Sequence, residues 1–139
     1  MRPAYCGRSW DFPKRFSTRY QMPDLAGVLV LAREELISAL IGLLVEASGH
    51  AVFFANPGER AEDAVRRTRA QVVIVDCDHS ECTQDLVRAA SEVSARLILF
   101  SASRDPDYVR RAAAASRSQS FTFPIEAPQL DSLIRRPVA

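Results

Sequence analysis

The sequence is short of several residue types, and each shortage narrows what the protein can be. It has three cysteines, Cys6, Cys77 and Cys82, which are too few and too irregularly spaced for a disulfide framework. No apolar run is long enough to cross a bilayer, and the N-terminus lacks the apolar stretch of a signal peptide. Lys14 is the only lysine among 18 basic residues, yet acidic residues hold the net charge at +1. We therefore expect a cytoplasmic protein whose overall charge attracts neither nucleic acid nor membrane.

Glycine is also sparse, and its placement excludes two common kinds of active site. The five glycines form no phosphate-binding glycine-rich loop. No serine stands in the tight turn that presents the nucleophile of a hydrolase. No helix-turn-helix pattern follows the last predicted helix. The sequence thus predicts neither an enzyme nor a DNA-binding effector.

Residues 1–26 differ in character from the rest of the chain. Basic residues outnumber acidic ones there, and aromatic residues are scattered without a helical or alternating period. This pattern predicts an irregular N-terminal arm. The arm is either a natural extension or the result of a start codon chosen upstream of the true one, since Met22 stands just before the first predicted strand. The status of residues 1–21 therefore stays open.

From residue 27 onward, apolar runs alternate with segments of helical period. We predict strands at 27–32, 51–55, 71–76, 96–101 and 120–123, and helices at 34–47, 59–69, 83–93, 105–116 and 128–136. Such alternation indicates a parallel sheet with helices on both faces. Right-handed connections then favour a flavodoxin-like (βα)5 fold with strand order 2-1-3-4-5, formed by residues 27–136 as one domain, with 137–139 as a tail.

The helical period also predicts which side chains face the sheet. In the first helix these are Leu36, Ile37, Leu40, Ile41, Leu44 and Val45; in the second Ala61, Ala64 and Val65; in the third Leu86, Val87, Ala90 and Val93; and in the last Leu130, Leu133 and Ile134. Asp105 followed by Pro106 predicts the start of the fourth helix, because aspartate caps helices and proline suits their first position.

The third predicted strand, VVIVD, ends in Asp76. Its four apolar residues indicate a strand buried on both faces, and the carboxyl end of such a strand is where α/β proteins bind ligands. Two later strands end in Ser101-Ala102 and Phe123-Pro124. With these residues at the ends of the third, fourth and fifth predicted strands, residues 27–136 resemble the receiver domain of bacterial response regulators. The resemblance implies that Asp76 stands at the phosphoacceptor position and Ser101 at that of the hydroxyl residue that binds the phosphoryl group.

Three positions depart from the pattern of that family. The family places two adjacent acidic residues after the first strand to hold the Mg²⁺ that offsets charge in phosphoryl transfer, and Ala32 and Arg33 stand there in this sequence. Phe123 replaces the lysine that contacts the phosphoryl group in the family. We therefore expect no magnesium or other cofactor, and no phosphorylation of Asp76 by the magnesium-dependent route.

Alternatives remain for the residues around this position. Arg33 either forms an ion pair with Asp76 or stays in solvent. Ser101 either moves in a switch or satisfies a loop backbone group. Glu34 or Asp78 could contribute to an unusual metal site, in which case Asp76 would still be phosphorylated.

A second class of function is open at the crevice between the strand ends. Arg33 and Arg104 could attract the phosphate of a nucleotide or of another small ligand there. The segment 77–82 holds zinc-ligand types, Cys77, His79 and Cys82 among them, but on one loop without a second pair elsewhere. We expect that loop to be polar rather than metal-binding.

Two surfaces are candidates for contact with protein partners. On the outer side of the first helix we predict Ala39, Gly42 and Leu43, where either a partner or the N-terminal arm would cover them. Charged residues also gather on the last two helices, a region through which receivers often dimerise, although a solvated face is the commoner reason for such charge. These residues are Arg110, Arg111, Asp131 and Arg135.

Taken as a resemblance, the pattern implies a degenerate receiver that acts as an interaction module in two-component signalling. The expected partner is a protein: a histidine kinase, a second regulator or another copy of the chain. The sequence predicts no nucleic-acid or membrane partner and no enzymatic activity.

Overall fold

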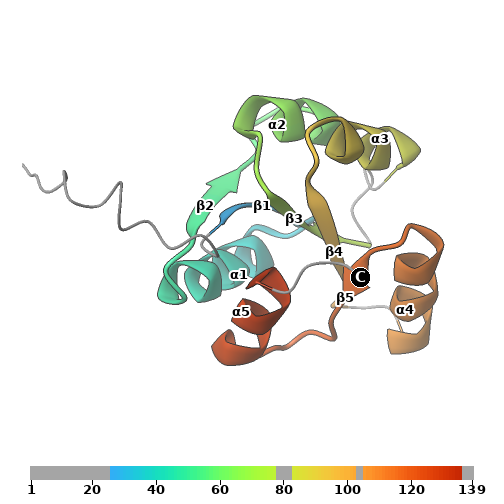
Figure 1. The fold of residues 1–139 in the computed structure, drawn as a ribbon. Coiled ribbons are helices and arrows are strands. Elements are labelled where there is room, and N and C mark those ends of the chain that lie inside the picture. The colour runs from blue at the N-terminus through green and yellow to red at the C-terminus, as the bar shows by residue number, and fades with distance from the viewer. Residues whose placement is uncertain (1–25, 78–82, 103–104, 136–139) are drawn as a thin grey trace, which may run out of the picture.

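Five parallel strands form one sheet in the order β2-β1-β3-β4-β5, which confirms the predicted topology. The computed structural model describes residues 26–77, 83–102 and 105–135. The strands are β1 (Gly27–Leu31), β2 (Ala51–Phe54), β3 (Val72–Asp76), β4 (Arg96–Phe100) and β5 (Gln119–Ser120). The helices are α1 (Glu35–Ala47), α2 (Ala61–Thr68), α3 (Gln84–Glu92), α4 (Pro106–Ala115) and α5 (Ala127–Arg135). Figure 1 shows helices on both faces of the sheet.

Alternation along the strands divides the core into two layers. Val28 and Val30 of β1 pack towards α1 and α5, whereas Leu29 and Leu31 pack towards α2, α3 and α4. All five residues of β3 are buried, as predicted for a strand covered on both faces. The buried central strands therefore hold in place the residues that directly follow each strand.

The fifth strand is shorter and begins earlier than predicted. It spans Gln119–Ser120 rather than 120–123, and it pairs with β4 on one side only. The N–H of Phe121 still donates to the main-chain oxygen of Leu99 at 3.0 Å. The ladder cannot continue through Pro124, because proline has no N–H to donate.

The predicted inner face of α1 is partly wrong. Ile41 and Val45 are buried, but Leu36 and Leu40 are 70% and 42% exposed. A helix on a sheet buries only one stripe, and each residue turns about 100° from the last, so neighbours of Ile37 and Ile41 point away from the sheet. In α3, Val87 is exposed and Ala89 is buried for the same reason.

The predicted helix ends agree with the structure. Asp105 caps α4 by accepting the N–H of Asp107 at 2.9 Å, and Pro106 is the first helical residue. Gly49, just after α1, has φ of 91°, a conformation that glycine adopts readily. No helix within the described ranges is long and apolar enough to cross a bilayer. The predicted arm lies almost entirely outside the described residues and stays a prediction.

Candidate functional site

The residues singled out from the sequence meet at the carboxyl edge of the sheet. Asp76 ends β3 and is 3% exposed, and its register partner in β4 is Phe100, which directly precedes the buried Ser101. Ala32 and Arg33 follow the end of β1, the strand on the other side of β3. Because neighbouring parallel strands end at the same edge, the buried Asp76 and Ser101 lie at the ends of adjacent strands.

The contact between Arg33 and Asp76 comes from the main chain. The N–H of Arg33 donates to Oδ2 of Asp76 at 3.4 Å, which is long for a hydrogen bond. The residue Arg33 itself is exposed. Among the described residues no ion pair joins its guanidinium to the carboxylate, so the structure favours the solvent-exposed alternative for this side chain.

The side chains that the structure describes at this edge do not fit a magnesium site. Mg²⁺ requires oxygen ligands in near-octahedral geometry, and Ala32 provides none while Arg33 carries a positive charge. Glu34 is exposed and lies at the N-cap of α1, where its main-chain oxygen accepts the N–H of Ser38 at 3.0 Å. In the part of the chain that the structure describes, no three His, Cys, Asp or Glu side chains gather closely enough to hold a metal ion. Asp78 and the rest of the 78–82 loop lie outside the described residues.

An aromatic cluster occupies the region where the family resemblance implies a lysine. The rings of Phe100 and Phe121 are stacked with centroids 5.1 Å apart, and the ring of Phe123 lies 6.1 Å from that of Phe100. Phe123 is half-buried against the core between the sheet and α1 and α5. Phe123 therefore adds apolar packing here rather than charge. The structural role of Phe100 was not anticipated from the sequence, although its place beside Ser101 was the available signal.

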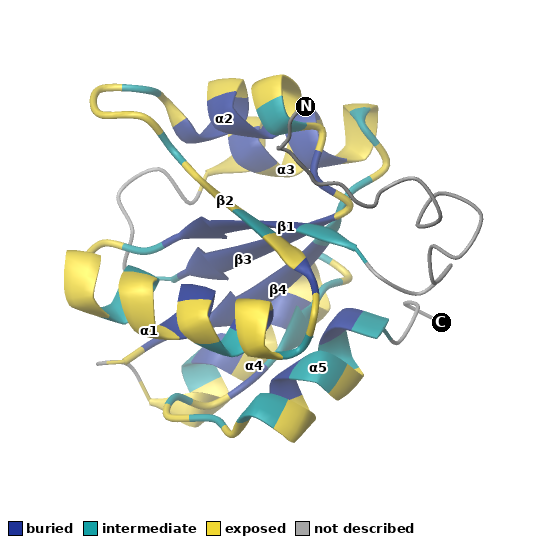
Figure 2. Ribbon diagram, turned by 90° about the vertical axis from the view of Figure 1, so that its left-hand side faces the viewer, coloured by how far each residue is buried: buried dark blue, intermediate teal, exposed yellow. Residues whose placement is uncertain are grey.

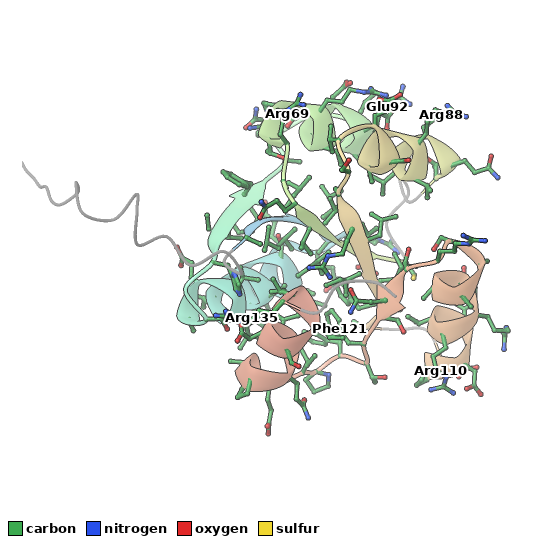
Figure 3. All side chains as sticks on the ribbon, in the orientation of Figure 1. Arg69, Arg88, Glu92, Arg110, Phe121 and Arg135 are labelled. Carbon is green, nitrogen blue, oxygen red and sulfur yellow. The ribbon has the colours of Figure 1, made fainter. Side chains whose placement is uncertain are left out.

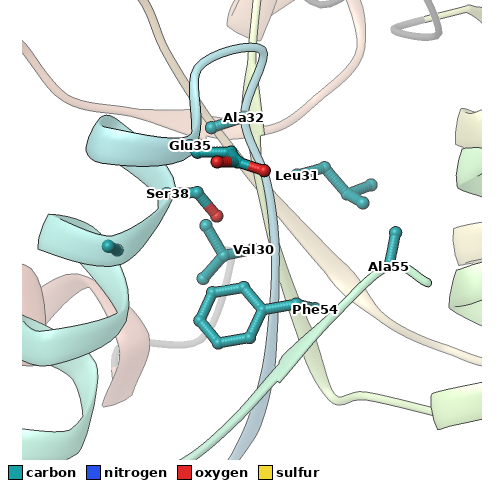
Figure 4. Close-up of a pocket in the computed structure, with 8 residues that line it drawn as sticks. Val30, Leu31, Ala32, Glu35, Ser38, Phe54 and Ala55 are labelled. Atoms are coloured by element: carbon teal, nitrogen blue, oxygen red, sulfur yellow. The ribbon is translucent and has the colours of Figure 1, made fainter. Parts of the chain in front are cut away.

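A pocket of about 340 Å³ lies beside this edge, between β1, β2 and α1. Figure 4 shows the Phe54 ring and the Glu35 and Ser38 side chains on its walls. None of the described residues that line it is cationic, so this lining does not suit the phosphate of a nucleotide. Arg104, the second cation of that alternative, lies outside the described residues.

The opposite, amino edge of the sheet holds a polar network that the sequence did not reveal. The N–H of Ala26 donates to Nδ1 of the buried His50 at 3.0 Å, so the ring proton lies on Nε2, which donates to Oδ1 of Asp131 at 2.7 Å. Arg135 donates to both oxygens of Asp131. Burial by itself would raise the pKa of Asp131, but hydrogen bonds from His50 and Arg135 outweigh it, and the pKa is lowered.

Arg96 ties the C-terminus of α5 to the same edge. Its Nη1 donates to Oε1 of Gln119 at 2.8 Å and to the main-chain oxygen of Leu133 at 3.3 Å, and its Nη2 donates to the main-chain oxygen of Ile134. These carbonyls are among those that a helix end leaves without partners, and a cation there also suits the helix dipole. Desolvation by burial lowers the pKa of the Arg96 guanidinium.

The candidate interface residues are only partly where the sequence placed them. Ala39 and Leu43 are exposed on α1, but Gly42 is buried, which corrects its assignment to the outer side. A Cβ at Gly42 would lie 2.7 Å from Cζ of Phe54, so the Phe54 ring covers this position. The structure thus gives Gly42 a packing role against β2.

The charged residues of α4 and α5 are largely paired within the chain. Arg110 pairs with Asp107 one turn away, and Asp131 and Arg135 belong to the network with His50. Arg111 is exposed. Figure 3 shows Arg110 projecting from α4 and Arg135 lying on α5. Dimerisation through these residues stays a prediction.

Comparison with solved structures identifies the class of fold. The signal receiver domain of a diguanylate cyclase from Desulfovibrio desulfuricans superposes with a TM-score of 0.66 at 22% identity, over 79% of this chain and 90% of that one. The chemotaxis protein CheY4 from Vibrio cholerae gives 0.65 at 16% identity, over 83% and 99%. The chain therefore has the flavodoxin-like fold of response-regulator receiver domains.

A third similar structure holds a metal ion. It is the receiver domain of a sensor histidine kinase from Pseudomonas aeruginosa, with magnesium coordinated in its active-site cleft; its TM-score is 0.64 at 17% identity, over 81% of this chain and 96% of that one. At such identities the likeness shows the fold alone. No protein-family model matches the sequence, and no curated protein sequence is significantly similar to it.

Proposed function

We propose that this protein is an interaction module of bacterial two-component signalling that works without phosphorylation of Asp76. The observation that carries the proposal is the set of side chains at the carboxyl edge. Asp76 keeps the position of a phosphoacceptor, but Ala32 and Arg33 stand where magnesium ligands would be needed. Phosphoryl transfer to a carboxylate brings two anions together, and Ala32 and Arg33 provide no oxygen ligand for the Mg²⁺ that would offset their repulsion.

The aromatic cluster supports the same proposal. In a receiver that is switched by phosphorylation, charge near the acceptor would have to change the packing of the last strands. Here Phe100, Phe121 and Phe123 pack on one another next to Ser101, and none of the three can bind a phosphoryl group. The protein would then signal by binding a protein partner: a histidine kinase, another regulator or a second copy of itself. It would bind in the single conformation that this packing stabilises.

Mass spectrometry of the intact protein after incubation with Mg²⁺ and acetyl phosphate tests the proposal. We expect no gain of mass that depends on Asp76. The matched control is the triple variant Ala32→Asp, Arg33→Asp and Phe123→Lys, which restores the missing groups and should gain one phosphoryl group. A stoichiometric gain in the wild-type protein that Asp76→Asn abolishes would overturn the proposal in favour of a phosphorylated regulator.

A further inference from the structure

The outer side of α1 carries an apolar surface with nothing packed on it in the described residues. Leu36, Leu40 and Leu43 are 70%, 42% and 62% exposed, and we call these three residues the leucine stripe. Their spacing of four and then three residues places them on one side of the helix. Figure 2 shows this exposed side of α1 facing away from the buried strands. Exposed leucines grouped in this way indicate a surface that another segment covers.

The charges on α1 restrict which segment that can be. Glu35 and Glu46 are exposed near its two ends, Glu34 is exposed at its N-cap, and no basic residue lies within the helix. A second copy packed through α1 would bring these carboxylates together: Glu35 would meet Glu46 in the antiparallel arrangement and Glu35 in the parallel one. Like charges placed opposite each other oppose such a contact. The surface suits an occupant that is apolar and basic.

Residues 1–25 of the same chain have this composition. They contain five aromatic side chains and five basic residues against two acidic ones. The aromatic residues are Tyr5, Trp10, Phe12, Phe16 and Tyr20; the basic ones are Arg2, Arg8, Lys14, Arg15 and Arg19. Such a segment can contact the leucines and the acidic ends of α1 together.

The first described residue, Ala26, lies near the C-terminal end of α1, within reach of the leucine stripe. Ala26 packs against the core layer of α1 and α5, and its N–H is held by Nδ1 of His50, three residues after α1 ends. The distance along α1 from Leu43 to Leu36 is about 10 Å at 1.5 Å per residue. Three or four extended residues span that length at about 3.3 Å each, so a segment of 25 residues reaches the whole leucine stripe.

We propose that residues 1–25 dock on the leucine stripe of their own chain, with aromatic side chains against the leucines and basic side chains near Glu35 and Glu46. The docked segment occupies the outer surface of α1, so any partner that binds there must displace it. This inference rests on the exposed residues of α1 and on the position of Ala26 near the C-terminal end of that helix. Its failure would leave the proposal about Asp76 untouched.

Trp10 is the only tryptophan in the chain, so its fluorescence reports on docking without any label. In the full-length protein we expect blue-shifted emission, with quenching by acrylamide severalfold weaker than in a synthetic peptide of residues 1–25. Neither quantity should change on dilution of the protein. Emission and quenching equal to those of the peptide would overturn the proposal, and protection that disappears on dilution would assign the contact to a second copy.

Two variants locate the contact. Leu36→Arg combined with Leu43→Arg should raise quenching to the level of the peptide, whereas Val87→Arg, an exposed apolar site on α3 at the other face of the sheet, should not. Arg15→Glu combined with Arg19→Glu changes only the segment, leaves every described residue unaltered, and should also raise quenching. Equal quenching in the Val87 variant and the leucine double variant, or no response to the arginine reversal, would contradict docking on this surface.

Discussion

The two edges of the sheet use polar side chains in opposite ways. At the amino edge, His50, Asp131 and Arg96 are buried or half-buried and each makes hydrogen bonds to groups far away in the sequence. At the carboxyl edge, the main-chain N–H of Arg33 donates to Asp76 at 3.4 Å, which is long for a hydrogen bond, and Phe123 packs against the ring of Phe100. Charged groups thus connect distant segments at the amino edge, whereas at the carboxyl edge Ala32, Arg33 and Phe123 stand where the receiver resemblance implies acidic residues and a lysine.

The largest stability loss should follow from removing Arg96 at the amino edge. Arg96→Met removes the Arg96 donor from the Ile134 carbonyl and from Oε1 of Gln119, and leaves the Leu133 carbonyl with the long bond from Nε2 of Gln119, so we expect the free energy of unfolding to fall by about 3 kcal/mol. Urea denaturation measures this. Arg88→Met is the matched control, because the Arg88–Asp85 pair is exposed and should contribute at most about 0.5 kcal/mol.

Removal of His50 should have the next largest effect. His50→Ala deletes a buried ring that accepts from Ala26 and donates to Asp131, so we expect a loss of about 2 kcal/mol. Hydrogen exchange at the Ala26 amide should also accelerate more than exchange at the centre of β3. An unchanged urea midpoint would mean that the ring network does not hold the amino edge.

Asp131 predicts that the stability contributed by the amino edge depends on pH. Its pKa in the folded protein lies below the ordinary value of 3.8, so its contribution to stability is present above that value and is lost as the pH falls through the folded pKa. Asp131→Asn should cost about 1 kcal/mol near neutral pH. The difference between the variant and the wild-type protein should disappear in strong acid, and a difference that persists there would contradict this role.

The smallest effect should come from Asp76 itself. Asp76→Asn keeps the size of the side chain and an oxygen that can accept the N–H of Arg33, and it removes a buried charge. We expect the free energy of unfolding to change by about 1 kcal/mol or less. Thermal unfolding of the wild-type protein and the variant would show it. A much larger loss would mean that the carboxyl edge is also a structural network.

The sequence predicted the order of the strands and helices because each central strand is a continuous apolar run. It also placed Asp76 and Ser101 at the ends of two neighbouring strands, because each of them closes such a run. It failed on α1, where apolar residues occur on more than one side of the helix, so the helical period alone could not choose between Ile37 and Leu36. Packing against β2 made that choice, with the Phe54 ring seated on Gly42.

The amino-edge network was out of reach for a different reason. His50 and Asp131 are 81 residues apart, and Arg96 lies 38 residues from Ile134. No local period or motif connects such pairs; only the parallel topology brings the ends of α1 and α5 to the same edge. The aromatic cluster could be predicted in part. The sequence shows that Phe123 replaces the lysine of the receiver family, but not that its ring packs against Phe100.

A magnesium titration followed by the main-chain amide signals of Arg33 and Cys77 tests directly whether the carboxyl edge binds the metal that phosphorylation of Asp76 requires. These two amides flank the carboxylate of Asp76, one by donating to it and the other by following it in the chain. We expect no saturable change in either signal at millimolar Mg²⁺, because the described residues of this edge offer a metal too few oxygen ligands. Saturable shifts at both amides that vanish in Asp76→Asn would contradict it.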